Sequence, residues 1–185
     1  NSSHIDGVIV QDLGLARFLK RTVPDLPIHA STQMTICNPD GVKTAAEMGF
    51  SRVVLSRELP KSQIEYITKH SPVEIEAFIH GALCMCYSGQ CYFSSMIGSR
   101  SGNRGSCAQP CRQLYKNGYE LSLKDLCLAH RFKDVLSLGA ASFKIEGRLK
   151  TEYYIASVVN AYRNAIDEYI TTGKLEVDKY LVELE

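Results

Sequence analysis

Short runs of apolar, often β-branched residues recur along the first half of the chain, and stretches with helical patterns separate them. The runs cover residues 6–10, 27–31, 52–56 and 74–79, at intervals of about 20 to 25 residues. Helices are predicted over residues 14–21, 39–48 and 61–69, and Pro39 and Gly49 stand where a helix starts and stops. Connections of this length join parallel strands, so the sequence predicts a βαβαβαβ arrangement.

The rest of the chain continues this alternation. We expect one helix over residues 122–139, a strand over residues 141–145 and a long helix over residues 151–172 that stops at Gly173. Such a pattern suits either a (β/α) barrel or an open doubly wound sheet. Five strands cannot close an eight-stranded barrel, and the sequence starts without Met, directly on a strand. We therefore expect a fragment whose remaining strands lie outside these residues.

Polar residues follow the predicted strands: Gln11, Asp12, Gln33, Arg57, Glu58, His80, Glu146 and Arg148. The carboxyl ends of parallel strands meet at one face, where barrel enzymes build their active sites. Lys144, Glu146 and Arg148 are spaced by two, so they are predicted to point to one side of the last strand. Because three charged side chains are costly to bury unpaired, we expect them at the opening of a site.

Six of the seven cysteines lie within residues 84–127. An odd number of cysteines without an export signal favours metal or cofactor ligation over a disulfide framework. Iron–sulfur clusters and zinc both accept four thiolates, but the gaps here are irregular and lack paired CxxC knuckles, which favours a cluster. No Asp or Glu occurs between Glu76 and Glu120, whereas four Arg and Lys residues do. This positive charge suits thiolates or an anionic substrate; the alternative is an ordinary solvated loop.

Two cysteines also have a simple packing interpretation. Cys37 lies far from the others and follows an apolar stretch, so it is predicted to be a small buried residue. Cys127 falls on the helix expected over residues 122–139, where burial in the core would explain it equally well.

Composition fits a single globular domain. The 185 residues are 45% hydrophobic and carry a net charge of +1, which allows a sizeable core. No run approaches the roughly 20 apolar residues of a membrane-spanning helix. We expect a soluble, cytoplasmic protein without a membrane partner. A net charge this small gives no independent sign of nucleic-acid binding.

Several long motifs resemble peptidase family U32, the collagenase-like peptidases. The stretch EAFIHGALCMCYSGQCYFSSMIGSRSGNRGSCAQPCR carries most of the likeness, which continues in SLKDLC, SFKIEGRLKTEYYIASVVNAYRNAID, ASTQM and RVVLSREL. The resemblance implies a parallel (β/α) barrel-like domain that here lacks its N-terminal strands. Residues 1–173 would belong to that domain, with a cysteine-rich insertion at 81–127, and residues 174–185 would start a following segment.

The resemblance also implies a [4Fe-4S] cluster. Better understood members of the family hold one with cysteines of this segment and hydroxylate without molecular oxygen. Their products are 5-hydroxyuridine in tRNA, 5-hydroxycytidine in rRNA or a ubiquinone precursor, and the RNA-modifying branches depend on prephenate as the oxygen source. Matched by motif, Cys84, Cys91 and Cys107 are expected ligands. For the fourth ligand the family pattern leaves Cys127, which we prefer, and Cys111.

Two functions follow from these expectations. The first is an oxygen-independent iron–sulfur RNA hydroxylase acting on tRNA or rRNA, in which cations near the strand ends bind a small dicarboxylate such as prephenate. These cations are Arg57, His80, Lys144 and Arg148. The second is a collagenase-like peptidase with structural cysteines, in which Glu58 or Glu146, the candidate catalytic residues, would act on water. No Ser or Cys stands in a nucleophile-elbow pattern. A third alternative, an RNA-binding module stabilised by zinc, is disfavoured because it gives the acidic residues at the strand ends no role.

Overall fold

The computed structural model describes residues 4–174, 176, 179 and 180. Its strands are β1 (Val8–Val10), β2 (Ile28–Ala30), β3 (Arg52–Val54), β4 (Glu74–Gly81), β5 (Leu126–Cys127) and β6 (Ser142–Glu146). Its α-helices are α1 (Leu13–Thr22), α2 (Pro39–Glu47), α3 (Lys61–His70), α4 (Phe93–Gly98), α5 (Phe132–Ser137) and α6 (Glu152–Thr172). Short 3₁₀ helices are η1 (Thr32–Met34), η2 (Gly102–Arg104), η3 (Pro110–Arg112) and η4 (Ala129–Arg131).

Five of the strands form a parallel sheet in the order β1-β2-β3-β4-β6. The exception is β5, which pairs antiparallel with His80 and Gly81 at the end of β4. Since β6 pairs with these same two residues, β5 occupies the opposite edge of β4, beyond the end of β3. A mixed α/β fold with a mainly parallel sheet confirms this much of the predicted fold class. Closure into a barrel is not seen within the described residues.

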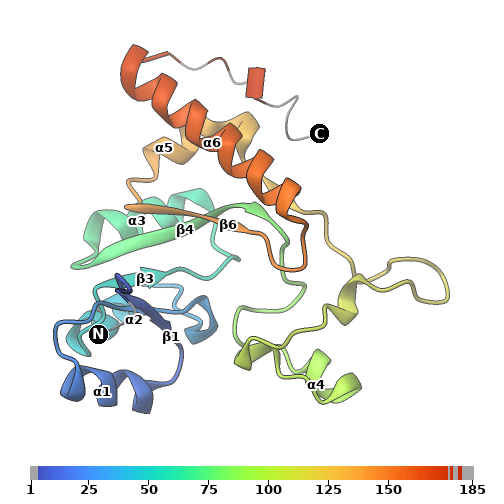
Figure 1. Ribbon diagram of the computed structural model, residues 1–185, viewed down its shortest axis with the longest axis horizontal. Helices are drawn as coiled ribbons and strands as arrows, with labels where there is room; N and C mark the ends of the chain where they lie inside the picture. The colour runs from blue at the N-terminus through green and yellow to red at the C-terminus, as the bar shows by residue number, and fades with distance from the viewer. Residues whose placement is uncertain (1–3, 175, 177–178, 181–185) are drawn as a thin grey trace.

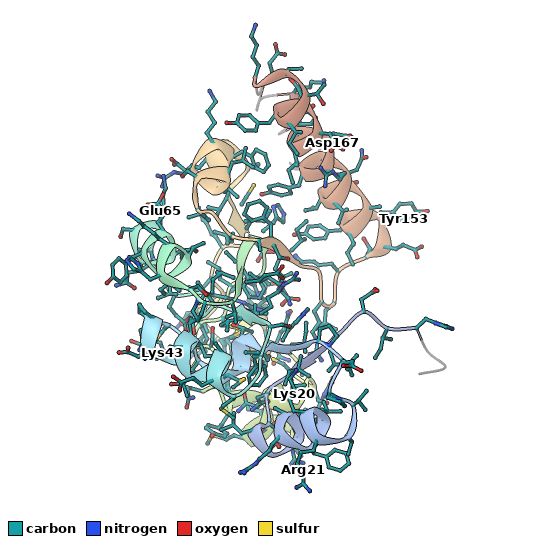
Figure 2. All side chains as sticks on the ribbon, turned by 90° about the vertical axis from the view of Figure 1, so that its left-hand side faces the viewer. Lys20, Arg21, Lys43, Glu65, Tyr153 and Asp167 are labelled. Atoms are coloured by element: carbon teal, nitrogen blue, oxygen red, sulfur yellow. The ribbon has the colours of Figure 1, made fainter. Side chains whose placement is uncertain are left out.

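Two groups of buried apolar side chains hold the helices against the sheet. Ala16 of α1 and Ile67 of α3 belong to the group that packs on β1, β2 and β3. Val158 of α6 belongs to the other group, and α5 and α6 lie together over β4 and β6 (Figure 1). Charged side chains such as Lys43 and Glu65 project outward from the helices (Figure 2). Among the residues that the structure describes, no helix combines the length and hydrophobicity needed to cross a bilayer.

The predicted strands and helices before residue 81 are confirmed, as are the last strand and the long C-terminal helix. The Asn38 side chain accepts a hydrogen bond from the backbone N–H of Gly41 at the start of α2. At the other end of the chain, Gly173 has a left-handed conformation and ends α6. Of the segment expected over residues 174–185, residues 175, 177, 178 and 181–185 lie outside the described part of the chain.

Two expectations about this part of the structure are wrong. Residues 122–139 are not one helix, because Leu126 and Cys127 are drawn into pairing with the free edge of β4 and leave only η4 and α5 as helices. Cys37 is exposed rather than buried. Its neighbour Ile36 takes the buried position in the core, with 7% of its surface exposed.

Candidate functional site

The face of the sheet turned away from the helices carries a line of charged residues. Ser142 and Lys144 of β6 both reach Glu76 of β4, with Ser142 Oγ 3.0 Å and Lys144 Nζ 2.9 Å from its carboxylate. Arg52 of β3 lies 3.4 Å from the same carboxylate. The intervening residues Phe143 and Ile145 pack toward α6 instead. The period-two alternation of β6 therefore holds, and it places Lys144 in an ion pair within the sheet.

A hollow of about 130 Å³ lies beyond the carboxyl ends of β4 and β6. Five cysteines line it: Cys84, Cys86, Cys91, Cys107 and Cys111. Arg57, Glu146 and Arg148 line the same hollow. The cysteine-bearing segment with α4 extends to one side of the sheet (Figure 1). Candidate residues from the ends of β3 and β6 thus meet the cysteines at one place.

Arg57 joins the sheet to the cysteine segment. Its Nη2 forms an ion pair of 2.7 Å with Glu146, and both side chains are mostly buried, with 13% and 20% of their surfaces exposed. Its Nη1 donates to the Cys84 sulfur at 3.2 Å and to the carbonyl of Ala82 at 3.2 Å. The guanidinium also stacks 4.1 Å above the centre of the Phe78 ring. Arg57 therefore holds a thiol, a carboxylate and an aromatic ring in fixed positions.

Two glycines permit the close approaches around this site. Gly81 has φ of +101°, and a Cβ there would lie 2.1 Å from the carbonyl oxygen of Glu146. Gly89 has φ of +77°, and its Cβ would lie 2.0 Å from the carbonyl oxygen of Gln33. Any other residue would collide with backbone at both positions. Gly81 thus lets β6 bring Glu146 up to the end of β4, while Gly89 seats the cysteine loop on η1.

Glu58 anchors the cysteine loop and does not line the hollow. Its two carboxylate oxygens accept hydrogen bonds from the backbone N–H and the hydroxyl of Ser88. The Ser88 carbonyl in turn accepts from Thr35 Oγ1 at 2.6 Å. Ser88 is 4% exposed. These contacts give Glu58 and Ser88 a positioning role in the loop.

The sulfur atoms in the hollow influence one another. Burial raises the pKa of the Cys84 thiol; nearby Arg57 opposes this rise, and Cys107 and Cys91 add to it. Burial likewise raises the pKa of Cys111, with contributions from Cys107 and Cys84 and opposition from Arg112. Neighbouring cysteines therefore disfavour the thiolate form of Cys84 and of Cys111, and a nearby cation favours it.

Cys127 and His80 lie elsewhere, among aromatic residues beneath α6. The Tyr162 hydroxyl is 3.3 Å from His80 Nδ1, and Cys127 belongs to the apolar group around Tyr162. The irregularity between Phe78 and His80 in the pairing of β4 with β6 turns the imidazole toward α6. Burial lowers the pKa of His80, so the ring is neutral near pH 7. Neither residue lines the hollow.

Gln33, one of the polar residues expected after the strands, does line the hollow, whereas Arg112 was not expected to line it. Arg112 forms an ion pair of 2.8 Å with Asp125 and donates to the carbonyl of Leu83 at 3.3 Å, so it ties the two ends of the segment together. Its position next to Cys111 was the available signal. Gln33 reaches the backbone of Gly102, 69 residues away, a contact that no local pattern indicates.

The chain is therefore an α/β domain with a mainly parallel sheet and a cysteine-lined hollow at the carboxyl ends of its strands. The chain belongs to the family described as Peptidase family U32, which it matches over residues 1–185. It is 36% identical over 184 residues to "tRNA hydroxylation protein P1" of Bacillus subtilis and 40% identical over 177 residues to "23S rRNA 5-hydroxycytidine C2501 synthase" of Escherichia coli. It is 34% identical over 191 residues to "Collagenase" of Porphyromonas gingivalis.

Each of these alignments covers 90% of this chain but only 44%, 27% and 45% of the respective relative. The chain therefore spans less than half the length of these relatives. Among solved structures, "The Structure of the U32 Peptidase Mk0906" matches with a TM-score of 0.39 and 19% identity over 44% of this chain and 34% of that one.

Proposed function

We propose that this chain is the cysteine-rich part of an oxygen-independent RNA hydroxylation enzyme with a [4Fe-4S] cluster. One observation carries the proposal. The 44 residues 82–125 contribute nothing to either group of core residues, yet they bring five thiols to one hollow. A segment without a hydrophobic core needs another source of order, and metal ligation is the usual one.

The donors in the hollow suit a cluster. Two of the five sulfurs receive N–H donors: Cys84 from Arg57 at 3.2 Å and Cys107 from the backbone of Gln109 at 3.3 Å. Hydrogen bonds of this kind stabilise cluster thiolates and tune their potential.

The spacing of the donors favours a cluster over a single metal ion. In the part of the chain that the structure describes, no three His, Cys, Asp or Glu side chains converge as one ion requires. A cluster distributes its thiolates over several metal atoms, which suits cysteines arranged around a hollow rather than gathered at a point.

We assign the ligands as Cys84, Cys91, Cys107 and Cys111. The first three match the expectation from the family motif. For the fourth, the geometry leads us to replace the preferred Cys127 with the alternative Cys111, because Cys111 lines the hollow and Cys127 packs near Tyr162.

The polar residues of the hollow would then bind and orient the substrates. A cluster would supply the redox chemistry that hydroxylation without molecular oxygen needs. Arg148 lines the hollow and makes no ion pair within the described residues, so it is our first candidate for binding a dicarboxylate oxygen donor such as prephenate. Arg57 is the second, held in place by Glu146. Lys144 and His80, expected to share this role, are occupied in other contacts.

An RNA substrate is supported by the relatives named for tRNA and rRNA hydroxylation and by the charge of the segment. Residues 77–119 include no Asp or Glu. Tyr87 and Tyr92 flank the cysteines in sequence, with 71% and 62% of their surfaces exposed. Exposed aromatic side chains stack on unpaired bases, and cations attract phosphates. This surface is therefore suited to single-stranded RNA in a cytoplasmic setting.

We further propose that the sheet is part of a (β/α) barrel whose inner face carries Glu76 and Lys144. These residues lie on the side opposite the helices, where a barrel has its interior. A peptidase has less support, because Glu58 is bound to Ser88 and Glu146 to Arg57. Neither carboxylate is left to activate water.

Anaerobic purification followed by iron and sulfide analysis tests the cluster. We expect close to four irons and four sulfides per chain. Colourless protein rich in zinc would overturn the proposal. Cys111→Ser is expected to abolish iron binding, whereas Cys127→Ser and the exposed control Cys37→Ser are expected to retain it. Loss of iron only in Cys127→Ser would restore the assignment that the motif suggested.

Hydroxylation itself is tested separately, without molecular oxygen, with the loaded protein, prephenate as the oxygen donor and unmodified tRNA or rRNA. Mass spectrometry of the digested RNA is expected to show a gain of one oxygen on a pyrimidine. A loaded protein that cleaves gelatin and leaves both RNAs unmodified would favour the peptidase.

A further inference from the structure

The short turn η1 and the residues beside it form the ASTQM motif, to which the proposed function gives no role. This turn is fastened to the sheet. Met34 packs against the core group on β1, β2 and β3, and the Thr32 hydroxyl donates to the carbonyl of Leu55 at 3.2 Å. Just beyond the turn, the backbone N–H of Ser56 donates to the carbonyl of Ile36 at 3.1 Å. The residues between these anchors therefore keep a fixed position relative to the strands.

Thr35, directly after η1, has a backbone conformation that β-branched residues rarely adopt. Its φ of +58° and ψ of +34° are left-handed. Such a conformation persists where the surrounding structure over-determines it. The Thr35 hydroxyl donates to the Ser88 carbonyl at 2.6 Å and accepts from Gln90 Nε2 at 3.0 Å. The strained residue therefore holds the chain immediately before Cys91.

Gln33 reaches a second part of the cysteine segment. Its side-chain amide donates to the carbonyl of Gly102 at 3.5 Å. Gly102 lies beside two cysteines, because a Cβ there would be 3.5 Å from Cys107 Cβ and 3.9 Å from the carbonyl oxygen of Cys91. The same turn thus contacts the chain near both cysteines.

We propose that η1 positions Cys91 and Cys107 relative to each other, with Thr35 and Gln33 as its positioning residues. The two cysteines are 16 residues apart, and the residues between them belong to neither core group. Their separation therefore depends on polar contacts, and η1 supplies those that refer both cysteines to the rigid sheet. The purpose of this positioning rests on the proposed cluster, whose thiolates need defined places that surrounding hydrogen bonds maintain.

The cluster-free whole chain tests the contacts themselves. Thr35→Val keeps the β-branched shape and removes both hydrogen bonds, while Glu58 still holds Ser88, so the fold should survive. Amide hydrogen exchange in residues 86–107 should then be roughly tenfold faster, because loss of two hydrogen bonds raises the population of the opened segment. Gln33→Leu, which loses one long hydrogen bond, should give about threefold.

Two variants serve as controls. Thr35→Ser restores the hydroxyl and should return the exchange rate to that of wild type. Thr44→Val makes the same substitution at an exposed position of α2, where the hydroxyl bonds the carbonyl of Asp40, and should leave exchange in residues 86–107 unchanged. Wild-type exchange in both Thr35→Val and Gln33→Leu would overturn the proposal.

The iron-loaded protein tests the consequence for the cysteines. Thr35→Val should bind iron, lose it in air about fivefold faster than wild type and show the electron paramagnetic resonance signal of a three-iron cluster, whereas Thr35→Ser should behave as wild type. Faster exchange with an unchanged spectrum and unchanged iron loss would show a merely structural seat and overturn the positioning role. Wild type without iron would refute the proposed function instead, and the exchange rates would then decide alone whether η1 fixes this segment.

Discussion

The buried carboxylate of Glu76 offers a direct test of the charged face of the sheet. Its side chain is 9% exposed and contacts Lys144 at 2.9 Å, Arg52 at 3.4 Å and Ser142 at 3.0 Å. Glu76→Gln keeps the shape of the side chain and removes the charge. Arg52 would keep its second partner, Glu74, but Lys144 has no other ion-pair partner within the described residues.

The expected cost follows from these exposures. Removing one partner of a fully buried ion pair costs about 3 to 5 kcal/mol. Lys144 is 29% exposed, and a glutamine oxygen can still accept its hydrogen bond, so we expect about 2 kcal/mol. For a chain of this size, that lowers the unfolding temperature by roughly 4–8 °C. Glu74→Gln is the matched control: its side chain is 54% exposed, and its loss should cost less than about 1 kcal/mol.

The pH dependence gives the assay a second, independent readout. Burial alone would raise the pKa of Glu76, but Lys144, Ser142 and Arg52 outweigh it and hold the pKa below its usual value. The stabilisation by the carboxylate is therefore complete above about pH 5 and is lost as the pH falls through this lowered pKa. Urea denaturation at pH 7 and in acid should show the gap between wild type and Glu76→Gln shrinking in acid. The reasoning would be refuted if Glu76→Gln and Glu74→Gln lost equal unfolding free energy, or if the difference between wild type and Glu76→Gln did not change with pH.

Two further predictions concern the hollow. Gly89→Ala should release the cysteine loop from η1 and cost about 1–3 kcal/mol of stability, because the left-handed φ of Gly89 and its contact with backbone exclude a Cβ. Limited proteolysis should cleave this variant faster than wild type. The control Gly98→Ala, at a position with open space around it, should be cleaved no faster than wild type. Glu146→Gln should lower stability by about 1–2 kcal/mol by breaking the pair with Arg57, while Arg148→Gln should change it by less than about 0.5 kcal/mol. Equal unfolding temperatures for these last two variants would show that the ion pair does not form.

Local patterns were sufficient where burial alone decides the structure. The strands before residue 81 follow from their β-branched runs, and α2 from Asn38 and Pro39 at its start. The helix predicted around Cys127 was wrong because this segment pairs with β4, more than 40 residues earlier in the sequence, and that pairing outweighs its apparent helical pattern. Sequence spacing carries no information about which strand edge is left free.

At the site, too, local sequence predicted which way side chains point along a strand but not which partners they meet. Alternation along β6 correctly placed Lys144 and Glu146 on one side of the strand, yet it could not say that Glu76 would take Lys144. His80 was expected to follow its strand but lies within β4, and the irregularity next to it turns the ring to the other face. Both outcomes depend on the neighbouring strand, which local sequence does not specify.

The antiparallel pairing of Gly81 with Leu126 means that residues 82–125 leave and rejoin the sheet at adjacent positions. Topologically, this segment is a hairpin loop 44 residues long. Closing such a loop costs about 3 kcal/mol of chain entropy beyond a constant term, and no residue within it belongs to either group of core residues that could offset that cost. A short turn in its place would close the same hairpin more favourably. The sheet is therefore expected to keep its strand pairing without residues 82–125, so that the cysteines lie on a removable loop while Arg57, Glu146 and Arg148 stay on the sheet.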